Sequence, residues 1–129
     1  MKYTGACHCQ QVRFEIEVNT PNTESTENLN ISRCNCSICT KSGFLHLIVD
    51  KANFHLISGE SALTIYQFNT GIAKHTFCKH CGIKAFYQPR SHPNGVSVNY
   101  NCLDQPLPAY TLRQFDGQNW EAAMAAEQD

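Results

Sequence analysis

The sequence predicts a mainly β domain built from short strands and held together by cysteines that bind metal. Stretches in which polar and apolar residues alternate recur along the 129 residues, with turn-forming residues between them. Eight cysteines occur, most of them in close pairs or triplets. Many short strands with frequent turns are typical of antiparallel sheets. A chain of this length is expected to form a single domain, covering residues 1–129.

The first strand is predicted over residues 11–18, where polar and apolar side chains alternate. Such an alternation is typical of a strand with one face on a core. The residues expected on that face are Val12, Phe14, Ile16 and Val18. Residues 19–30 are polar and include a proline, which predicts a surface loop. Cysteine-bearing segments lie on both sides of this loop, so it is not expected to separate two domains.

Further strands are predicted where short apolar stretches lie between turn signals. The turn signal Ser58–Ser61 predicts a hairpin between strands at residues 52–58 and 62–68. The remaining predicted strands cover residues 44–49, 74–77, 83–88, 95–102 and 109–115. Residues 119–126, which are rich in Ala and Glu, form the one segment predicted to be helical, a short C-terminal helix.

Charge and composition exclude several classes of partner. Ten basic against eleven acidic side chains give no reason to expect nucleic acid or an anionic membrane surface. No apolar run near Met1 resembles a signal peptide, and none reaches the roughly 20 residues of a membrane helix. The chain is therefore expected to be soluble and cytoplasmic. In a reducing compartment, cysteines at these spacings favour metal ligands over disulfides.

One predicted metal site combines two cysteine pairs. Cys78 and Cys81 have the spacing of a zinc knuckle, and Gly82 can adopt the backbone angles that such a turn needs. Cys7 and Cys9 would point to the same side of an extended strand and supply the other two ligands. Four protein ligands are typical of a structural zinc. If Cys7 and Cys9 were only buried thiols, the knuckle would lack half of its ligands.

A second predicted site has only three neighbouring thiols. Cys34, Cys36 and Cys39 form a C-x-C-x-x-C pattern with no fourth cysteine or histidine beside them. A zinc ion with three protein ligands and one free position is typical of a catalytic site. Together the two sites predict two zinc ions per chain.

Other readings of this second site remain open from the sequence. Cys102 could close it as a fourth ligand, although Cys102 also fits the apolar side of the strand predicted at 95–102. His46, His55 and His75 are alternative fourth ligands, and the thiols could also bind no metal at all. Basic side chains near the triplet could offset the charge of a three-thiolate zinc complex or contact an anionic substrate. These are Arg33 and Lys41.

The order of these motifs resembles the glutathione-dependent formaldehyde-activating enzymes and their centromere-protein-V-like relatives. The resemblance extends from Gly5 to about Trp120. The matching stretches are Gly5–Cys9, Cys34–Cys39, Phe77–Gly82, Leu103–Asp104 and Phe115–Trp120. It implies a zinc-stapled fold of antiparallel sheets of the β-tent type. It also implies that the four-cysteine site is structural and that the three-cysteine site holds the catalytic zinc.

The activity that the resemblance implies joins formaldehyde to the thiol of glutathione. The product is S-hydroxymethylglutathione, so the reaction is formally that of a carbon–sulfur lyase running in reverse. The resemblance thus implies a zinc enzyme that acts on a small thiol or aldehyde adduct, with glutathione as the thiol. The alternative is a zinc-stapled binding module without catalytic activity, because one fold can serve many functions.

Overall fold

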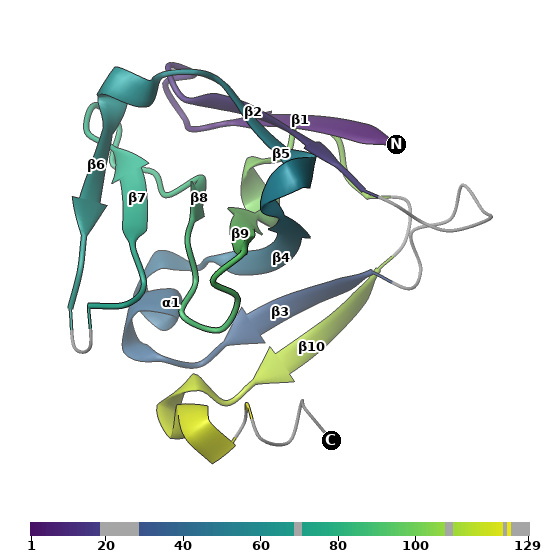
Figure 1. The fold of residues 1–129 in the computed structure, drawn as a ribbon, viewed down its shortest axis with the longest axis vertical. Helices are drawn as coiled ribbons and strands as arrows, with labels where there is room; N and C mark the ends of the chain where they lie inside the picture. The colour runs from purple at the N-terminus through teal and green to yellow at the C-terminus, as the bar shows by residue number, and fades with distance from the viewer. Residues whose placement is uncertain (19–28, 69–70, 108–109, 123, 125–129) are drawn as a thin grey trace.

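The structure, a computed structural model, describes residues 1–18, 29–68, 71–107, 110–122 and 124. It confirms the mainly β prediction, with three sheets and short helical turns (Figure 1). Most of the loop predicted at 19–30 lies outside the described residues, and Asn30 already begins a strand. Among the described residues, no helix combines the length and the apolar character needed to cross a membrane.

The first sheet has three antiparallel strands in the order β1-β2-β5. Its strands are β1 (Lys2–Ala6), β2 (Arg13–Glu17) and β5 (Phe54–Ser58). A separate pair of antiparallel strands, β6 (Leu63–Tyr66) and β7 (His75–Cys78), forms the smallest sheet. Figure 1 shows this pair standing beside the ends of the other two sheets.

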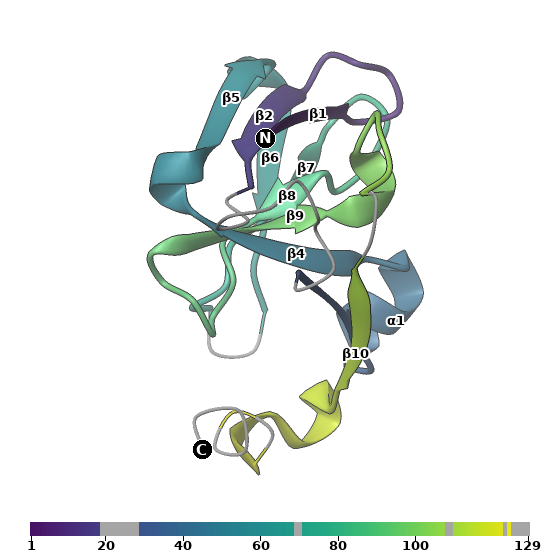
Figure 2. The same ribbon diagram turned by 90° about the vertical axis from the view of Figure 1, so that its right-hand side faces the viewer.

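The largest sheet has five strands in the order β10-β3-β4-β9-β8. These are β3 (Asn30–Cys34), β4 (Leu45–Asp50), β8 (Phe86–Tyr87), β9 (Gly95–Asn99) and β10 (Thr111–Phe115). Its pairs are antiparallel except for β10 and β3, which run parallel. Figure 2 shows β10 passing beside α1 (Ser37–Ser42) into the C-terminal segment.

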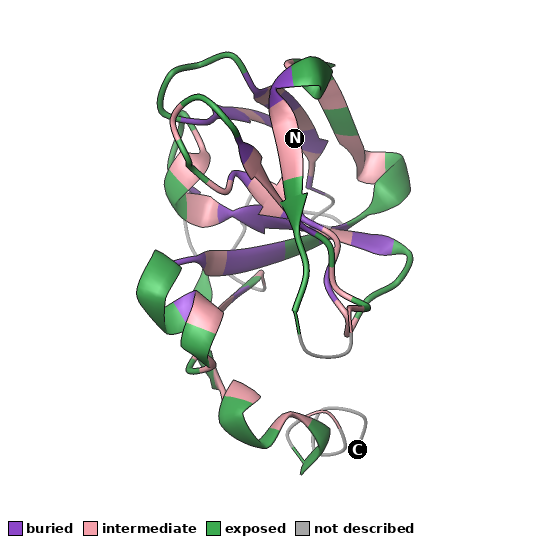
Figure 3. Ribbon diagram, turned by 90° about the vertical axis from the view of Figure 1, so that its left-hand side faces the viewer, coloured by how far each residue is buried: buried purple, intermediate pink, exposed green. Residues whose placement is uncertain are grey.

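The main core lies between the three-stranded and five-stranded sheets. The predicted alternation in β2 is confirmed, because Phe14 and Ile16 are fully buried and Glu15 between them is not. They pack against Ile31 and Val98 of the opposite sheet. Burying one such side chain contributes about 1.5–3 kcal/mol. Figure 3 shows the buried residues concentrated in the strands, whereas the C-terminal segment is mostly exposed.

The hairpin predicted from residues 52–58 and 62–68 is wrong. β5 pairs with β2, and β6 pairs with β7, so the turn between β5 and β6 connects two sheets. Gly59 has a φ of 90°, and the 3-10 turn Glu60–Ala62 follows it. This conformation redirects the chain instead of folding it back on itself, because a left-handed residue followed by a helical turn does not match a tight hairpin.

Other differences concern helical turns and strand lengths. The helix α1 was not predicted, because it has only six residues and is rich in Ser, Thr and Cys, which are poor helix formers. The strand predicted at 95–102 ends at Asn99, and the 3-10 turn Tyr100–Cys102 follows. At the C-terminus, the 3-10 turn Gly117–Asn119 leads into helical residues 120–122 and 124, and the rest of the predicted helix lies outside the described residues. The fourth 3-10 turn is Lys51–Asn53.

Replacing Gly59 with alanine is expected to destabilise the fold by at least about 2 kcal/mol. A Cβ at this position would collide with the backbone carbonyl of Gln11, and the positive φ adds strain. Gly71 has a φ of 70° but open space around its Cα, so Gly71→Ala should cost only about 1 kcal/mol. Thermal or urea unfolding measures both variants, and equal losses would show that the contact with Gln11 is unimportant.

Candidate functional site

The four cysteines predicted to form one site lie together. Cys7 and Cys9 follow β1, Cys78 ends β7 and Cys81 lies in the next turn, with all four sulfurs within 4.8 Å of one another. Cys9 Sγ lies 3.6 Å from both Cys7 Sγ and Cys78 Sγ. Zinc–sulfur bonds of about 2.3 Å in a tetrahedron separate neighbouring sulfurs by about 3.8 Å. The donor set and its spacing therefore fit a zinc ion.

The backbone reason given for Cys7 and Cys9 is wrong, although the two sulfurs do converge. Both residues lie in a turn after β1, not in an extended strand. The turn is closed by a hydrogen bond from the Gln10 N–H to the Cys7 carbonyl, and Gln10 has a φ of 71°. Gly82 behaves as predicted in the knuckle, with a φ of 77° and its N–H donating to the Cys78 carbonyl.

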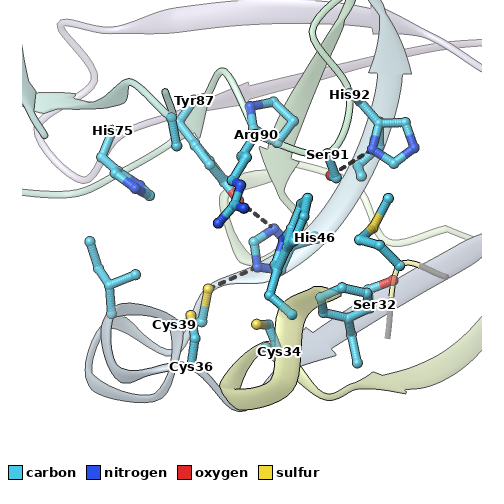
Figure 4. Close-up of a pocket in the computed structure, with 18 of the residues that line it drawn as sticks. Ser32, Cys34, Cys36, Cys39, His46, His75, Tyr87, Arg90, Ser91 and His92 are labelled. Atoms are coloured by element: carbon cyan, nitrogen blue, oxygen red, sulfur yellow. Dashed lines mark hydrogen bonds between the residues drawn. The ribbon is translucent and has the colours of Figure 1, made fainter. Parts of the chain in front are cut away.

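The three remaining cysteines of the prediction form a second cluster. Cys34 ends β3, Cys36 is the N-cap of α1 and Cys39 lies in its first turn, with the three sulfurs within 4.8 Å of one another (Figure 4). The helix brings Cys36 and Cys39 to the same side, since residues three apart are neighbours on a helix. Gly43, with a φ of 67°, ends it by donating its N–H to the Cys39 carbonyl.

Within the described residues, no fourth donor atom lies within 4.8 Å of all three sulfurs. Cys102 packs instead against the main core, where its carbonyl oxygen approaches Gly5. His55 is exposed on β5, in a different sheet. His46 approaches the cluster most closely, with its Nε2 3.1 Å from Cys39 Sγ. This geometry makes His46 a hydrogen-bond partner of Cys39 and leaves one side of the cluster open.

His46 is buried in a polar layer behind the cluster. Its Nδ1 lies 2.9 Å from the Ser97 hydroxyl and 3.3 Å from the Tyr87 hydroxyl. Burial lowers the pKa of His46 to about 4, so the ring is neutral at neutral pH. With its proton on Nε2, the ring donates to the Cys39 sulfur and accepts from the hydroxyls at Nδ1. Such outer contacts fix the orientation of a metal ligand.

The three thiols of the second cluster share their charge unequally. Hydrogen bonds from the thiols of Cys34 and Cys39 lower the pKa of Cys36 to about 2. Hydrogen bonds with Cys34 and with Cys36, together with burial, raise the pKa of the Cys39 thiol. A sulfur that accepts two hydrogen bonds is stabilised as the thiolate, and its donors are stabilised as thiols. The negative charge of the cluster is therefore concentrated on Cys36.

A cavity of about 210 Å³ opens beside this second cluster. Its wall includes all three cysteines, and three histidines and one arginine also line it, but no Asp or Glu does among the described residues. Figure 4 shows His46, His75 and Arg90 arranged around the space above the cysteines. Arg33 and Lys41, the cations expected to accompany the cluster, are exposed and do not line the cavity.

His75 faces the cavity and is paired with a lysine behind it. The Lys84 ammonium lies 2.5 Å from His75 Nδ1 and stands 3.8 Å above the centre of the Tyr87 ring. Burial lowers the pKa of Lys84 to about 8 and the pKa of His75 to about 4. The neutral His75 ring therefore accepts from Lys84 at Nδ1 and keeps its own proton on Nε2.

The C-terminal turn closes one side of the second cluster. Asn35 donates from its side chain to Asp116 Oδ1 at 3.0 Å, and its own Oδ1 accepts the Gln118 N–H at 3.0 Å. These bonds hold Gly117 against the cluster, where a Cβ would collide with Cys34 Sγ. A glycine is therefore required at this contact.

Sequence reasoning missed the histidines, Lys84 and Arg90 as parts of the site. His46 and His75 were considered only as alternative fourth ligands, and both line the cavity without joining the three sulfurs. A signal was present for His46, because it interrupts the otherwise apolar stretch at 44–49. Lys84 and Arg90 carry no local signal, since their place beside the cavity depends on how β7 and β8 pack.

Comparisons with known proteins agree with this arrangement. The family model described as "Glutathione-dependent formaldehyde-activating enzyme" matches residues 2–118. A solved crystal structure of a Rhodobacter sphaeroides protein is 32% identical in sequence and has a TM-score of 0.68. The match covers 84% of this chain and 99% of that protein. The family match spans the residues of both cysteine clusters, and the likeness to the solved structure covers most of the fold.

Replacing Gly117 with alanine is expected to displace the C-terminal turn from the second cluster. The new Cβ cannot fit against Cys34 Sγ, so Cys34 should become more accessible. In metal-free protein, we expect iodoacetamide to alkylate Cys34 several times faster than in the unaltered chain, as measured by peptide mass spectrometry. Gly43→Ala is the control, because a Cβ at Gly43 would have no neighbour within 4 Å, although Gly43, unlike Gly117, has a positive φ. Equal rates in the Gly117 variant and the unaltered chain would contradict the packing.

Proposed function

Because the chain belongs to the glutathione-dependent formaldehyde-activating enzyme family, we propose that it is a zinc-dependent enzyme of the carbon–sulfur lyase type. Its substrate would be a small thiol and an aldehyde, or the adduct of the two, with glutathione and formaldehyde as the family's example. One observation carries the proposal. The three sulfurs of Cys34, Cys36 and Cys39 converge on the wall of a cavity, and no fourth protein donor joins them among the described residues.

The two cysteine clusters have different roles in this proposal. Cys7, Cys9, Cys78 and Cys81 hold a structural zinc, because four ligands leave no position for a substrate and none of the four lines the cavity. Cys34, Cys36 and Cys39 hold a second zinc that faces the cavity. When bound there, zinc supplies an exchangeable position that can hold a thiol as its thiolate or polarise a carbonyl oxygen.

The reaction involves two proton movements: the thiol releases its proton to solvent as the thiolate forms, and the carbonyl oxygen gains a proton that the chain can provide. A carbon–sulfur bond forms as the substrate thiolate attacks the aldehyde carbon, and the carbonyl oxygen becomes a hydroxyl by taking up a proton. His75 Nε2–H faces the cavity, and Lys84 behind it can replace the proton at Nδ1. A pKa of about 8 makes Lys84 a suitable donor near neutral pH. In the reverse direction, the same pair would remove the proton.

A non-catalytic binding module is the second candidate. The exposed apolar residues of the β6–β7 sheet favour it, since Ile65 and Tyr66 are more than half exposed. In such a module, both clusters would serve only to hold the fold together. The two candidates therefore differ in what they require of Cys39 and Cys81.

Substituting one ligand in each cluster separates the two candidates. We expect Cys81→Ser to lower the unfolding temperature strongly, because structural zinc contributes free energy of folding directly. Cys39→Ser should lower it much less while abolishing activity. Both variants should bind one zinc per chain instead of two, measured by elemental analysis of the purified protein. A binding module would instead lose similar stability in both variants and show no activity in either.

Cobalt substitution tests the open position without relying on turnover. Added thiol should change the visible spectrum of cobalt in the second cluster and not that of cobalt in the four-cysteine site. The change should therefore disappear in Cys39→Ser. It should persist in protein that holds zinc in the four-cysteine site and cobalt in the second cluster alone. One metal per chain, or two metals whose spectra ignore thiols, would refute the proposed role.

The role of Lys84 predicts a particular pH dependence. Its ammonium is the protonated form below about pH 8, so adduct formation above the spontaneous rate should fall as the pH rises through about 8. Lys84→Met should lower the rate at least about tenfold and remove this decline, because the proton source is gone. Lys41→Met serves as control, since Lys41 is exposed and outside the cavity. A decline that persists in Lys84→Met would assign it to another group.

A further inference from the structure

We propose that Arg90 recognises a carboxylate on the thiol substrate and that Trp120 holds Arg90 in position. The inference rests on the proposed function, because it names the class of thiol that the cavity accepts. It would make the preferred substrate a mercaptocarboxylate in place of a neutral thiol.

The first support is the position of Arg90 in the cavity. Arg90 lines the same cavity as Cys39 and His46. Figure 4 shows the side chain reaching into the cavity on the side away from Cys34 and Cys36. A molecule whose sulfur meets the cysteine cluster would therefore have its other end near the guanidinium.

The second support is that Arg90 has no acidic partner. Both ion pairs found among the described residues lie elsewhere, Lys2 with Glu15 and Arg13 with Asp104. No Asp or Glu among the described residues lines the cavity. A half-buried guanidinium without a carboxylate keeps a strong preference for one, since its donors match the two oxygens of a carboxylate.

The third support is the way in which Arg90 is held. Its guanidinium carbon lies 3.7 Å from the centre of the Trp120 ring. Stacking occupies the face of the guanidinium and leaves the N–H groups at its edge available for a ligand. Trp120 directly follows the turn that Asn35 fixes through Asp116 and Gln118. The same turn that covers Cys34 thus prepares the anion contact, which lowers the entropy lost on binding.

A different role for Arg90 would be to offset the negative charge of the metal–thiolate cluster. That role would affect every thiol equally, because it acts on the cluster and not on the substrate. Carboxylate recognition would affect only thiols that carry the anion. A matched pair of ligands therefore distinguishes the two roles.

The test titrates cobalt-substituted full-length protein with 3-mercaptopropionate and with 3-mercaptopropionamide, which has the same length but no charge. We expect the unaltered chain to bind the carboxylate about tenfold or more tightly than the amide. Arg90→Gln should remove this preference and leave the Kd of the amide unchanged. Trp120→Leu should reduce the ratio of the two affinities, since Trp120 stacks on Arg90. Arg33→Gln, an exposed arginine outside the cavity, should keep it.

Each other outcome overturns the inference in a recognisable way. Equal affinities in the unaltered chain would exclude carboxylate recognition while leaving the proposed function intact. An equal loss for both ligands in Arg90→Gln would assign Arg90 to charge compensation. A spectrum that neither ligand changes would contradict the proposed function itself and this inference with it. Unfolding curves of the variants show whether any loss comes from misfolding.

Discussion

The arrangement of the three sheets depends on the contact between the turn after β1 and the turn after β7. Cys7 and Cys78 meet there and share a small buried cluster with Val12 and Ala62. The Lys79 N–H donates to the Ala62 carbonyl at 2.8 Å, which extends the β6–β7 pairing up to this contact. The β6–β7 sheet shares no strand with the other two sheets, so this contact holds one end of it, while the bridge between Lys74 and Gln88 and the bond from the Thr76 hydroxyl to the Phe86 carbonyl link β7 to β8. Because His75 begins β7, a site that only stabilises the fold also places one wall of the cavity.

A buried polar layer gives the cavity its chemical character. His46 on β4 and Ser97 on β9 are buried where apolar side chains would be the rule, and Asn99 donates to the Lys84 carbonyl at 3.1 Å. Buried polar groups are stable only when their hydrogen bonds are satisfied, and these satisfy one another. The layer therefore holds His46 against Cys39 and Lys84 against His75 with little freedom to move.

The sequence predicts those parts of the molecule that depend on local spacing. The alternation at 11–18 identified the core face of β2, and the cysteine spacings identified both clusters, because these patterns reflect geometry within a few residues. The pairing of β5 with β2 and of β10 with β3 could not be predicted, since it depends on packing between distant segments. Lys84 and Arg90 were missed for the same reason. Nothing near them in the sequence distinguishes them from surface cations.

The parallel pairing of β10 with β3 has a consequence for the order in which the chain folds. Pairing between segments far apart in the sequence requires a large loop to close first, and such contacts tend to form late. β3 can pair with β4 through the short connection that contains α1, so Cys34, Cys36 and Cys39 can come together before β10 arrives. During synthesis, the second cluster would then be accessible from the side that the C-terminal turn later covers. A metal ion could enter by this route before Gly117 closes over Cys34.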